Sequence, residues 1–318
     1  MILAVIVIYQ RAPSESQAFC SFAQILNTNP DLAKVFSLIV YDNSPERHEI
    51  ETTIGFPTFY MHDPANGGMA AAFNFALAHA EEKHFEWLLL LDQDTSPTAD
   101  FFCELVACTN SLRARQEVSS IVPKLLVNGK VYSPEAHFID QLRHQYQRSS
   151  HSLRREIVGV QQGRLSAYNS GATFRVSALL SIGGFPKAFW LDYLDHAVFH
   201  ALSVRNYQMY VMRTEIEHEA SQASLGNVPV WRQRNILWAQ TLFVKQTGNF
   251  FDRLLYRIWV LRYSRSLWIC HPDKRLWKEA LFQTLLLRTR TEGPPSNIER
   301  KSDESNTEIP PAGIVKVR

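Results

Sequence analysis

The sequence has few cysteines and no long apolar run. Its four cysteines, at positions 20, 103, 108 and 270, form no CxxC pair and no regular framework. This spacing favours reduced thiols in a cytosolic protein over a set of disulfides. No uninterrupted apolar run approaches the ~20 residues that a membrane-spanning helix needs, so we expect no such span.

Neither sign of charge is in clear excess over the whole chain. The 33 Lys and Arg residues and 31 Asp and Glu residues leave a formal net charge of +2, so the global charge identifies no partner. The apolar opening, residues 1–8, lacks the basic segment of a signal peptide and ends at the polar residues 9–11. We therefore interpret it as a buried first strand.

Short apolar runs alternate with helical patterns through the first third of the chain. The runs cover residues 2–8, 36–41, 57–61 and 87–91, and the helical patterns cover 16–26, 69–82 and 99–109. Such alternation predicts an α/β fold with a mostly parallel central sheet covered by helices on both faces. Ligands in these sheets bind beyond the carboxyl ends of the strands, so we expect the site at that edge.

The pattern changes after residue 117. Asn128 and Gly129 separate two short apolar segments and predict a hairpin, whereas residues 140–156 are polar and basic and predict a loop. The end of the chain is rich in Pro, Ser, Glu and Asn, which predicts disorder. We therefore expect an α/β domain over residues 1–225, a helical region over 226–290 and a disordered tail over 291–318.

Two carboxylates follow the fourth predicted strand directly. Asp92 and Asp94, spaced i and i+2, can both address one hard cation such as Mg²⁺ or Mn²⁺. Such ions are bound by oxygen ligands and by substrate phosphates. The alternative is that Asp94 or Thr95 merely caps the next helix.

Further polar residues follow the second and third strands. Asp42 ends the second strand and could accept a hydrogen bond from a nucleotide base, or it could simply form a turn. Asn66 and Gly68 precede an Ala-rich helix, where glycine permits close approach of a ligand and the helix N-terminus favours anions. The alternative is close packing of that helix on the sheet. Asn74, inside the helix, favours a ligand or a loop-clamping role.

A third group of candidates lies later in the chain. Asp192 and Asp195, three residues apart, share a helix face, and one of them could act as a general base beside Trp190. The alternative is a surface acid pair that caps a helix. His218, between two glutamates, could bind an Mn²⁺-type ion or could be a structural histidine.

Taken together and in this order, these segments resemble family 2 glycosyltransferases with the GT-A fold. The likeness is greatest to the bacterial rhamnosyltransferase-type members. It includes residues 169–171 and 183–185 and extends over about residues 2–220, and residues 91–94 are its most subtype-specific part. It implies a GT-A, Rossmann-like sheet over residues 1–225.

The resemblance implies a role for each position. On the donor side, Asp42 would contact the nucleotide base, and Asp92 and Asp94 would hold the metal and diphosphate, with His218 completing the metal site. The donor site would also be lined by Tyr9, Asn66, Gly68 and Asn74. Asp195 would be the catalytic base, and Trp190 and Asp192 would contact the acceptor. The family often places a second acid two residues after the base. Here that position is Ala197, which puts the acceptor contacts in doubt.

The resemblance also implies a reaction. A divalent ion, Mg²⁺ or Mn²⁺, would neutralise the leaving nucleoside diphosphate, and direct displacement at the sugar would invert its configuration. We expect transfer of a sugar, such as rhamnose from dTDP-rhamnose, onto a growing or lipid-linked cell-surface glycan. The alternatives are another UDP- or GDP-sugar as donor, or an inactive homologue that scaffolds a glycan-assembly complex.

The predicted helical region concentrates positive charge and tryptophan. Residues 231–290 hold 12 Lys and Arg against 3 Asp and Glu, and five of the seven Trp. Arg253 and Arg257 fall on one predicted helix face, and residues 254, 255 and 258 fall on another. Basic helices of this kind favour an anionic membrane surface, with packing or a homodimer interface as the alternatives and no nucleic-acid partner. The protein would then lie on the cytoplasmic face of the membrane.

Overall fold

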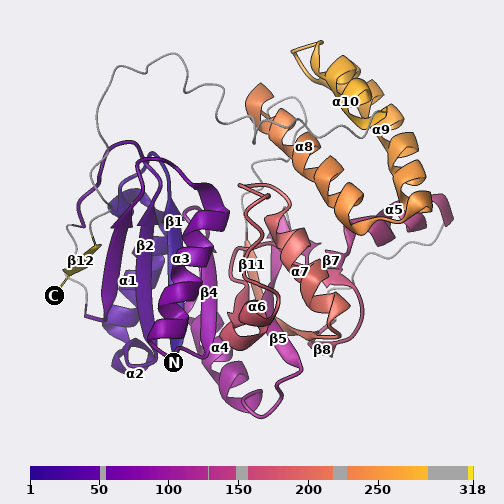
Figure 1. Ribbon diagram of the computed structural model, residues 1–318. Coiled ribbons are helices and arrows are strands. Elements are labelled where there is room, and N and C mark those ends of the chain that lie inside the picture. Colours follow the sequence, from indigo (N-terminus) through magenta and orange to yellow (C-terminus); the bar gives the residue numbers. More distant parts are fainter. Residues whose placement is uncertain (51–54, 128, 148–156, 218–227, 286–313, 318) are drawn as a thin grey trace.

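A computed structural model describes residues 1–50, 55–127, 129–147, 157–217, 228–285 and 314–317. Its centre is a ten-stranded sheet (Figure 1). From edge to edge the strands are β12 (Ile314–Val317), β3 (Thr58–His62), β2 (Phe36–Asp42), β1 (Ile2–Ile8), β4 (Trp87–Asp92), β10 (Thr173–Arg175), β5 (Val118–Val127), β11 (Gln208–Glu217) and β8 (Gly159–Gln161), with β6 (Lys130–Ser133) paired to β5. Most of the predicted disordered tail, residues 291–318, lies outside the described residues, but its residues 314–317 form β12, which pairs antiparallel with β3.

The sheet is mostly parallel, as the alternating pattern predicted. Strands β3, β2, β1 and β4 run parallel to one another, and so do β5 and β11. The short β10 lies antiparallel between β4 and β5 and joins the two parallel sets. The hairpin predicted around Gly129 is confirmed, because β5 and β6 pair antiparallel on either side of it.

Helices cover both faces of the sheet, because alternate strand residues feed two separate cores. In β1, Leu3, Val5 and Val7 belong to one apolar cluster, and the residues between them belong to the other. The first cluster packs under α3 (Gly68–Glu82), α6 (Val176–Ser181) and α7 (Leu194–Val204), and the second packs under α1 (Gln17–Thr28) and α4 (Ala99–Ser111). The short η1 (Pro13–Glu15) and α2 (Pro30–Ala33) flank α1.

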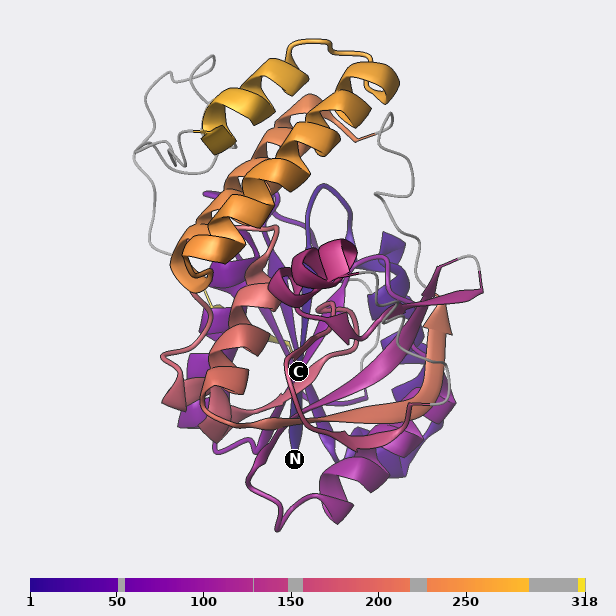
Figure 2. The same ribbon diagram turned by 90° about the vertical axis from the view of Figure 1, so that its right-hand side faces the viewer.

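The C-terminal helices form a layer beside α5 and α7 (Figures 1 and 2). They are α8 (Val230–Thr247), α9 (Phe250–Cys270) and α10 (Leu276–Leu285), and Trp238, Phe243 and Tyr256 extend the first apolar cluster into them. The helical prediction for this region is confirmed. No helix in the described part of the chain is long and apolar enough to cross a membrane.

One local prediction is wrong. The segment predicted as a loop over 140–156 begins with α5 (Phe138–Gln147), and residues 148–156 lie outside the described residues. The helix forms because Phe138, Ile139 and Leu142 are buried at helical spacing, and two of these three residues precede the polar stretch. Before α5, the strand β7 (Glu135–Ala136) pairs with β9 (Leu165–Ser166) in a separate two-stranded sheet.

Candidate active site

Three neighbouring strands end together and bring the first candidates to one edge. In the register of the sheet, Ile8 at the end of β1 lies opposite Asp42 of β2, and Val7 lies opposite Asp92 of β4. Parallel strands share their carboxyl edge, so the loops that begin with Tyr9 and with the residue after Asp92 leave the sheet side by side. The predicted position of the site at this edge is consistent with this arrangement.

Hydrogen bonds hold Asp92 and Gln93, where β4 ends and its loop begins. Asp92 accepts a hydrogen bond from the Ser170 hydroxyl at 2.5 Å. The side-chain amide oxygen of Gln93 accepts a hydrogen bond from the backbone N–H of Tyr9, and the backbone carbonyl of Gln93 accepts one from the Ser16 hydroxyl. Within the described part of the chain, no hydrogen bond or ion pair is recorded for the Asp94 carboxylate, which is half-buried. The contacts of Asp92 and Gln93 therefore fix the start of the loop next to Asp94.

These residues fit a divalent cation that is shared with a substrate. Thr98 caps α4, with its hydroxyl accepting from Phe101 N–H, so the cap that was the alternative role for Asp94 is supplied elsewhere. Among the described residues, no group of three or more His, Cys, Asp or Glu side chains is placed to hold a metal. One or two carboxylates together with substrate phosphates suffice for Mg²⁺. The third predicted ligand, His218, lies outside the described residues.

Asp42 is fully buried and surrounded by donors. It accepts hydrogen bonds from Ser44 N–H at 2.8 Å, from the Tyr60 hydroxyl at 2.5 Å, and from the backbone and ring of His48. Burial alone would raise the pKa of Asp42, but these hydrogen bonds outweigh it and hold that pKa below its usual value. The described geometry thus gives Asp42 the turn-forming role, and its contact with a nucleotide base stays a prediction.

The glycine-rich loop is closed over by Trp190. The Trp190 indole N–H donates to the Asn66 carbonyl at 3.1 Å, and the Trp190 carbonyl accepts from Met69 N–H. Gly68 has a φ of +81°, and a Cβ there would lie 2.4 Å from the indole ring. Among the described contacts, Gly68 is therefore required by close packing. The predicted acceptor contact of Trp190 is untested.

Asn74 acts as a clamp between α3 and a distant loop. Its amide group donates to the Phe185 carbonyl and its amide oxygen accepts from Phe185 N–H, at 2.8 and 2.9 Å. The same NH₂ group also donates to the Ala70 carbonyl, one turn earlier in α3. This is the loop-clamping role left open by the sequence, and it fixes the segment that leads to Trp190.

The two later aspartates are buried rather than a surface pair. Asp195 lies in the first turn of α7 and is 9% exposed. Asp192 precedes the N-cap Tyr193, whose φ is +64°, so the predicted shared helix face is wrong. Burial raises its pKa to about 6, although the N–H of His196 donates to it at 2.8 Å. Asp192 accepts a 2.5 Å hydrogen bond from Asn235 and lies 3.6 Å from Arg232, both on α8. Burial also raises the pKa of Asp192, against the effect of Arg232.

A third acid, Glu135, lies close enough to interact with Asp195 and was missed by the sequence analysis. Burial raises its pKa to about 7, and the negative charge of Asp195 adds to that rise. Glu135 also raises the pKa of Tyr168, whose ring stacks on Tyr132 at 5.4 Å. No motif in the sequence marks Glu135, because β7 lies far from α7 along the chain and the fold, including the β7–β9 pairing, brings them together.

A short segment joins the two groups of acids. Tyr168 lies close enough to Glu135 and Asp195 for their charges to raise its pKa, after the larger effect of burial. Two residues later, the Ser170 hydroxyl donates to Asp92. Residues 168–170 therefore connect the loop after β4 to the surroundings of Asp195.

The histidines around α7 provide no positive charge to offset the negative charge of Asp195. Burial lowers the pKa of His137 to about 3 and that of His196 to about 4, and it also lowers the pKa of His200. These rings are neutral at neutral pH, so they do not favour ionisation of Asp195. Ala197, where the family often has a second acid, is buried in the apolar core.

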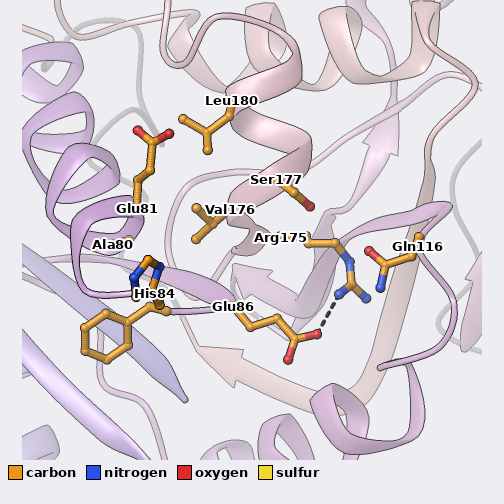
Figure 3. A pocket seen from close by; sticks show the side chains of 10 residues that line it. Ala80, Glu81, His84, Glu86, Gln116, Arg175, Val176, Ser177 and Leu180 are labelled. Carbon is orange, nitrogen blue, oxygen red and sulfur yellow. Dashed lines mark hydrogen bonds and ion pairs between the residues drawn. The ribbon is translucent and has the colours of Figure 1, made fainter.

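A shallow pocket lies elsewhere, at the opposite end of β4 (Figure 3). It is lined by Arg175 and Glu86, which form an ion pair at 2.7 Å, and by parts of α3 and α6. Arg175 is almost fully buried, donates to the Val118 and Leu112 carbonyls, and lies over the Trp87 ring at 4.2 Å. These contacts give Arg175 a structural role, and the pocket lies outside the acid site.

The doubly covered sheet, with acids gathered beyond its carboxyl edge, is the arrangement of a GT-A glycosyltransferase. Residues 4–175 match the sequence model of glycosyl transferase family 2. The chain belongs to this family and is a glycosyltransferase. A search of curated protein sequences found no match.

Solved structures show the same fold at low identity. A crystal structure of S. aureus TarS 1-349 in complex with UDP-GlcNAc has 11% identity and a TM-score of 0.50, covering 90% of this chain and 81% of that one. GalNAc-T7 with UDP, GalNAc and Mn²⁺ has 11% identity and a TM-score of 0.52, covering 91% and 58%. A longer S. aureus TarS structure has 12% identity and a TM-score of 0.48, covering 91% of this chain, which spans about half (49%) of the TarS chain.

Proposed function

We propose that this glycosyltransferase moves a sugar from a nucleoside diphosphate onto an acceptor hydroxyl with inversion, and that Asp195 is its base. The observation that carries the proposal is the link through residues 168–170. It ties Asp92 at the sheet edge to the surroundings of a buried Asp195. A donor site and an acceptor site would then adjoin along this segment.

The chemistry of Asp195 supports the role of a base. A general base works best with a pKa near the operating pH, and burial raises the pKa of Asp195 to about 6. At neutral pH the carboxylate is ionised and can accept the proton of an acceptor hydroxyl while that oxygen attacks the anomeric carbon. Direct displacement needs no enzyme nucleophile, and it inverts the configuration of the sugar.

The donor side would depend on a divalent cation. Asp94 would be the closer ligand, with Asp92 oriented by Ser170, and His218 would complete the site. A bound Mg²⁺ or Mn²⁺ would neutralise charge on the departing diphosphate. The chain's own contribution is to fix the loop through Gln93, Tyr9 and Ser16 so that Asp94 is presented at the edge.

The finer assignments extend the resemblance to rhamnosyltransferase-type members. The donor would be dTDP-rhamnose, and the acceptor a growing or lipid-linked cell-surface glycan. Two of the matched structures hold uridine nucleotides, UDP-GlcNAc in one and UDP in the other. This favours a UDP-sugar as the second candidate donor. A lipid-linked acceptor would place the protein on the cytoplasmic face of a membrane.

A thermal-shift panel tests the donor and the cation together. The protein is heated with dTDP-rhamnose, UDP-sugars and GDP-sugars, each with Mn²⁺, with Mg²⁺ or with EDTA. A donor at about 100 times its Kd should stabilise the fold by about 2.7 kcal/mol, and EDTA should abolish the shift. Asp94→Asn should lose the shift, whereas Asp100→Asn, an exposed acid of α4, should keep it. Binding that survives thorough chelation would contradict the metal role, and no shift with any donor would contradict the donor class.

A further inference from the structure

The longest helix of the C-terminal layer has one face fixed against the protein. In α9, Leu255, Tyr256, Val260 and Leu267 are buried. Asp252, on the same side of the helix, accepts two hydrogen bonds from the Arg143 guanidinium of α5, at 2.7 and 2.8 Å. These contacts determine which side of α9 faces away from the protein, and Figure 2 shows α9 along the outer side of the layer.

The outward side of α9 carries a line of large apolar side chains along its length. Five of its large exposed side chains, Phe250, Leu254, Ile258, Leu261 and Trp268, have exposed fractions between 38% and 82%, and the exposed Phe251 and Ile269 lie beside them. Steps of three, four and seven residues place the five on one side of a helix. At 1.5 Å per residue they form a line about 27 Å long. We refer to these five residues as the α9 stripe.

Basic side chains border the α9 stripe. By helical spacing Arg257 and Arg262 lie on its two sides, and Arg265 lies within it; Arg262 and Arg265 are exposed, and Arg257 is half-buried. The long side chains of arginine can lie along apolar surface while their charged ends reach water or phosphate. Arg253, which the sequence placed on the same face as Arg257, instead donates to the Lys245 carbonyl.

The acidic residues of the layer are engaged with basic partners. Asp252 pairs with Arg143, Asp273 pairs with Arg275, and Glu279 pairs with Arg234 through two hydrogen bonds at 2.8 and 2.7 Å. These are all the Asp and Glu residues of the described helices α8–α10 and their connections. The face that carries the stripe is therefore apolar and positive.

We propose that the α9 stripe lies in the surface of an anionic lipid membrane. Aromatic and aliphatic side chains would enter the boundary between headgroups and acyl chains, and the bordering arginines would contact lipid phosphates. A second copy of this chain is a poorer occupant, because two stripes with the same arginine borders would bring like charges together. This proposal rests on the proposed function in one respect: a lipid-linked acceptor would be within reach of an enzyme bound to the membrane.

The test uses the full chain and vesicles, without any sugar substrate. Wild-type protein should cosediment with vesicles of phosphatidylglycerol and phosphatidylcholine at low salt, and bind at least tenfold less to phosphatidylcholine alone. Leu254→Glu with Leu261→Glu should reduce binding at least tenfold. The matched control Val204→Glu places the same charge at an exposed apolar residue of α7, and should bind like wild type. All substitutions are at exposed positions, and the thermal unfolding of each variant verifies its fold.

A second pair of variants tests the charge. Arg262→Glu with Arg265→Glu should weaken binding to anionic vesicles about tenfold, whereas Arg113→Glu with Arg205→Glu, exposed and outside the layer, should not. Anionic vesicles that fail to bind wild type at low salt would overturn the proposal. So would wild-type self-association that the Leu254 and Leu261 variants abolish, since the stripe would then be an interface between copies. Donor binding without vesicles should be the same in all variants, so a failure of the donor assay bears on the proposed function alone.

Discussion

Replacing Asp195 by Asn removes a charge that the fold holds away from water. Burial raises the pKa of Asp195 from the usual 3.8 to about 6. A shift of about two units corresponds to roughly 3 kcal/mol between the two protonation states. Because the folded-state pKa is raised, wild-type stability is highest below the unfolded pKa and falls as the pH rises through the folded pKa. Asp195→Asn should therefore be the more stable protein at pH 8, by up to about 3 kcal/mol, and equal to wild type near pH 4.

The same substitution should abolish most turnover. A general base contributes about 10²–10⁴-fold in rate, so the variant should lose turnover by that factor and keep its donor affinity within a few-fold. In wild type, turnover should fall as the pH drops below about 6, because the Asp195 carboxylate becomes protonated. A gain in stability together with a loss of turnover is the pattern of a residue kept for catalysis at the expense of folding.

Three measurements test the role assigned to Asp195: the pH profile of sugar transfer, urea unfolding at pH 8 and pH 4, and calorimetric donor binding. Asp100→Asn removes an exposed acid of α4 and should change none of the three. Turnover near wild type in Asp195→Asn would move the base to Asp192 or Glu135. Equal stability of the two proteins at pH 8 would contradict the cost assigned to burying the Asp195 charge.

Two further predictions concern the surroundings of the acids. Gly68→Ala should lower the unfolding free energy by at least about 2 kcal/mol, because it adds strain at positive φ and a Cβ 2.4 Å from the Trp190 ring. The control Gly129→Ala is also at positive φ but has no neighbour within 4 Å, so it should cost less in the same urea titration. Glu135→Gln should remove any inflection near pH 7 from the pH profile of turnover and keep the one near pH 6, because the pKa of Glu135 is raised to about 7. Loss of most turnover in Glu135→Gln would instead make Glu135 the base.

The sheet was predictable because its strands are buried on both faces. Apolar runs such as residues 36–41 and 87–91 became β2 and β4, with β1 between them. The positions of Asp42 and Asp92 at strand ends followed from those runs. The α5 helix was not predictable in the same way, because its apolar side begins at Phe138, before the polar stretch that suggested a loop.

The site was only partly predictable, because sequence order does not reveal which side chains meet. Spacing suggested that Asp192 and Asp195 share a helix face, but α7 begins at Leu194. Spacing also gave no sign of the burial that raises the pKa of each. The amide of Asn74 suggested a ligand or a clamp, and contact with Phe185, 111 residues away, gives the clamp. Glu135 had no sequence signal at all, since its proximity to Asp195 depends on the pairing of β7 with β9.

The C-terminal helices support both parts of the chain that carry the acids: residues 192–195 and the segment around Glu135. On α8, Asn235 and Arg232 hold Asp192, and Gln240 donates to the Tyr193 hydroxyl at 2.6 Å. Tyr193 is the N-cap of α7 and has a φ of +64°, so these contacts fix the turn on which Asp195 stands.

The segment that carries Glu135 is held by the C-terminal helices in a similar way. Arg143 of α5, the helix that follows β7 and Glu135, forms a paired contact with Asp252 of α9. The region expected to begin at residue 226 therefore holds Asp192 and the turn that leads into α7 and Asp195, and it stabilises the helix next to Glu135. If α9 lies on a lipid surface as proposed, its pair with Arg143 joins that surface to α5, and α8 joins the same layer to Asp192, so a shift of α9 would be transmitted to both parts of the site.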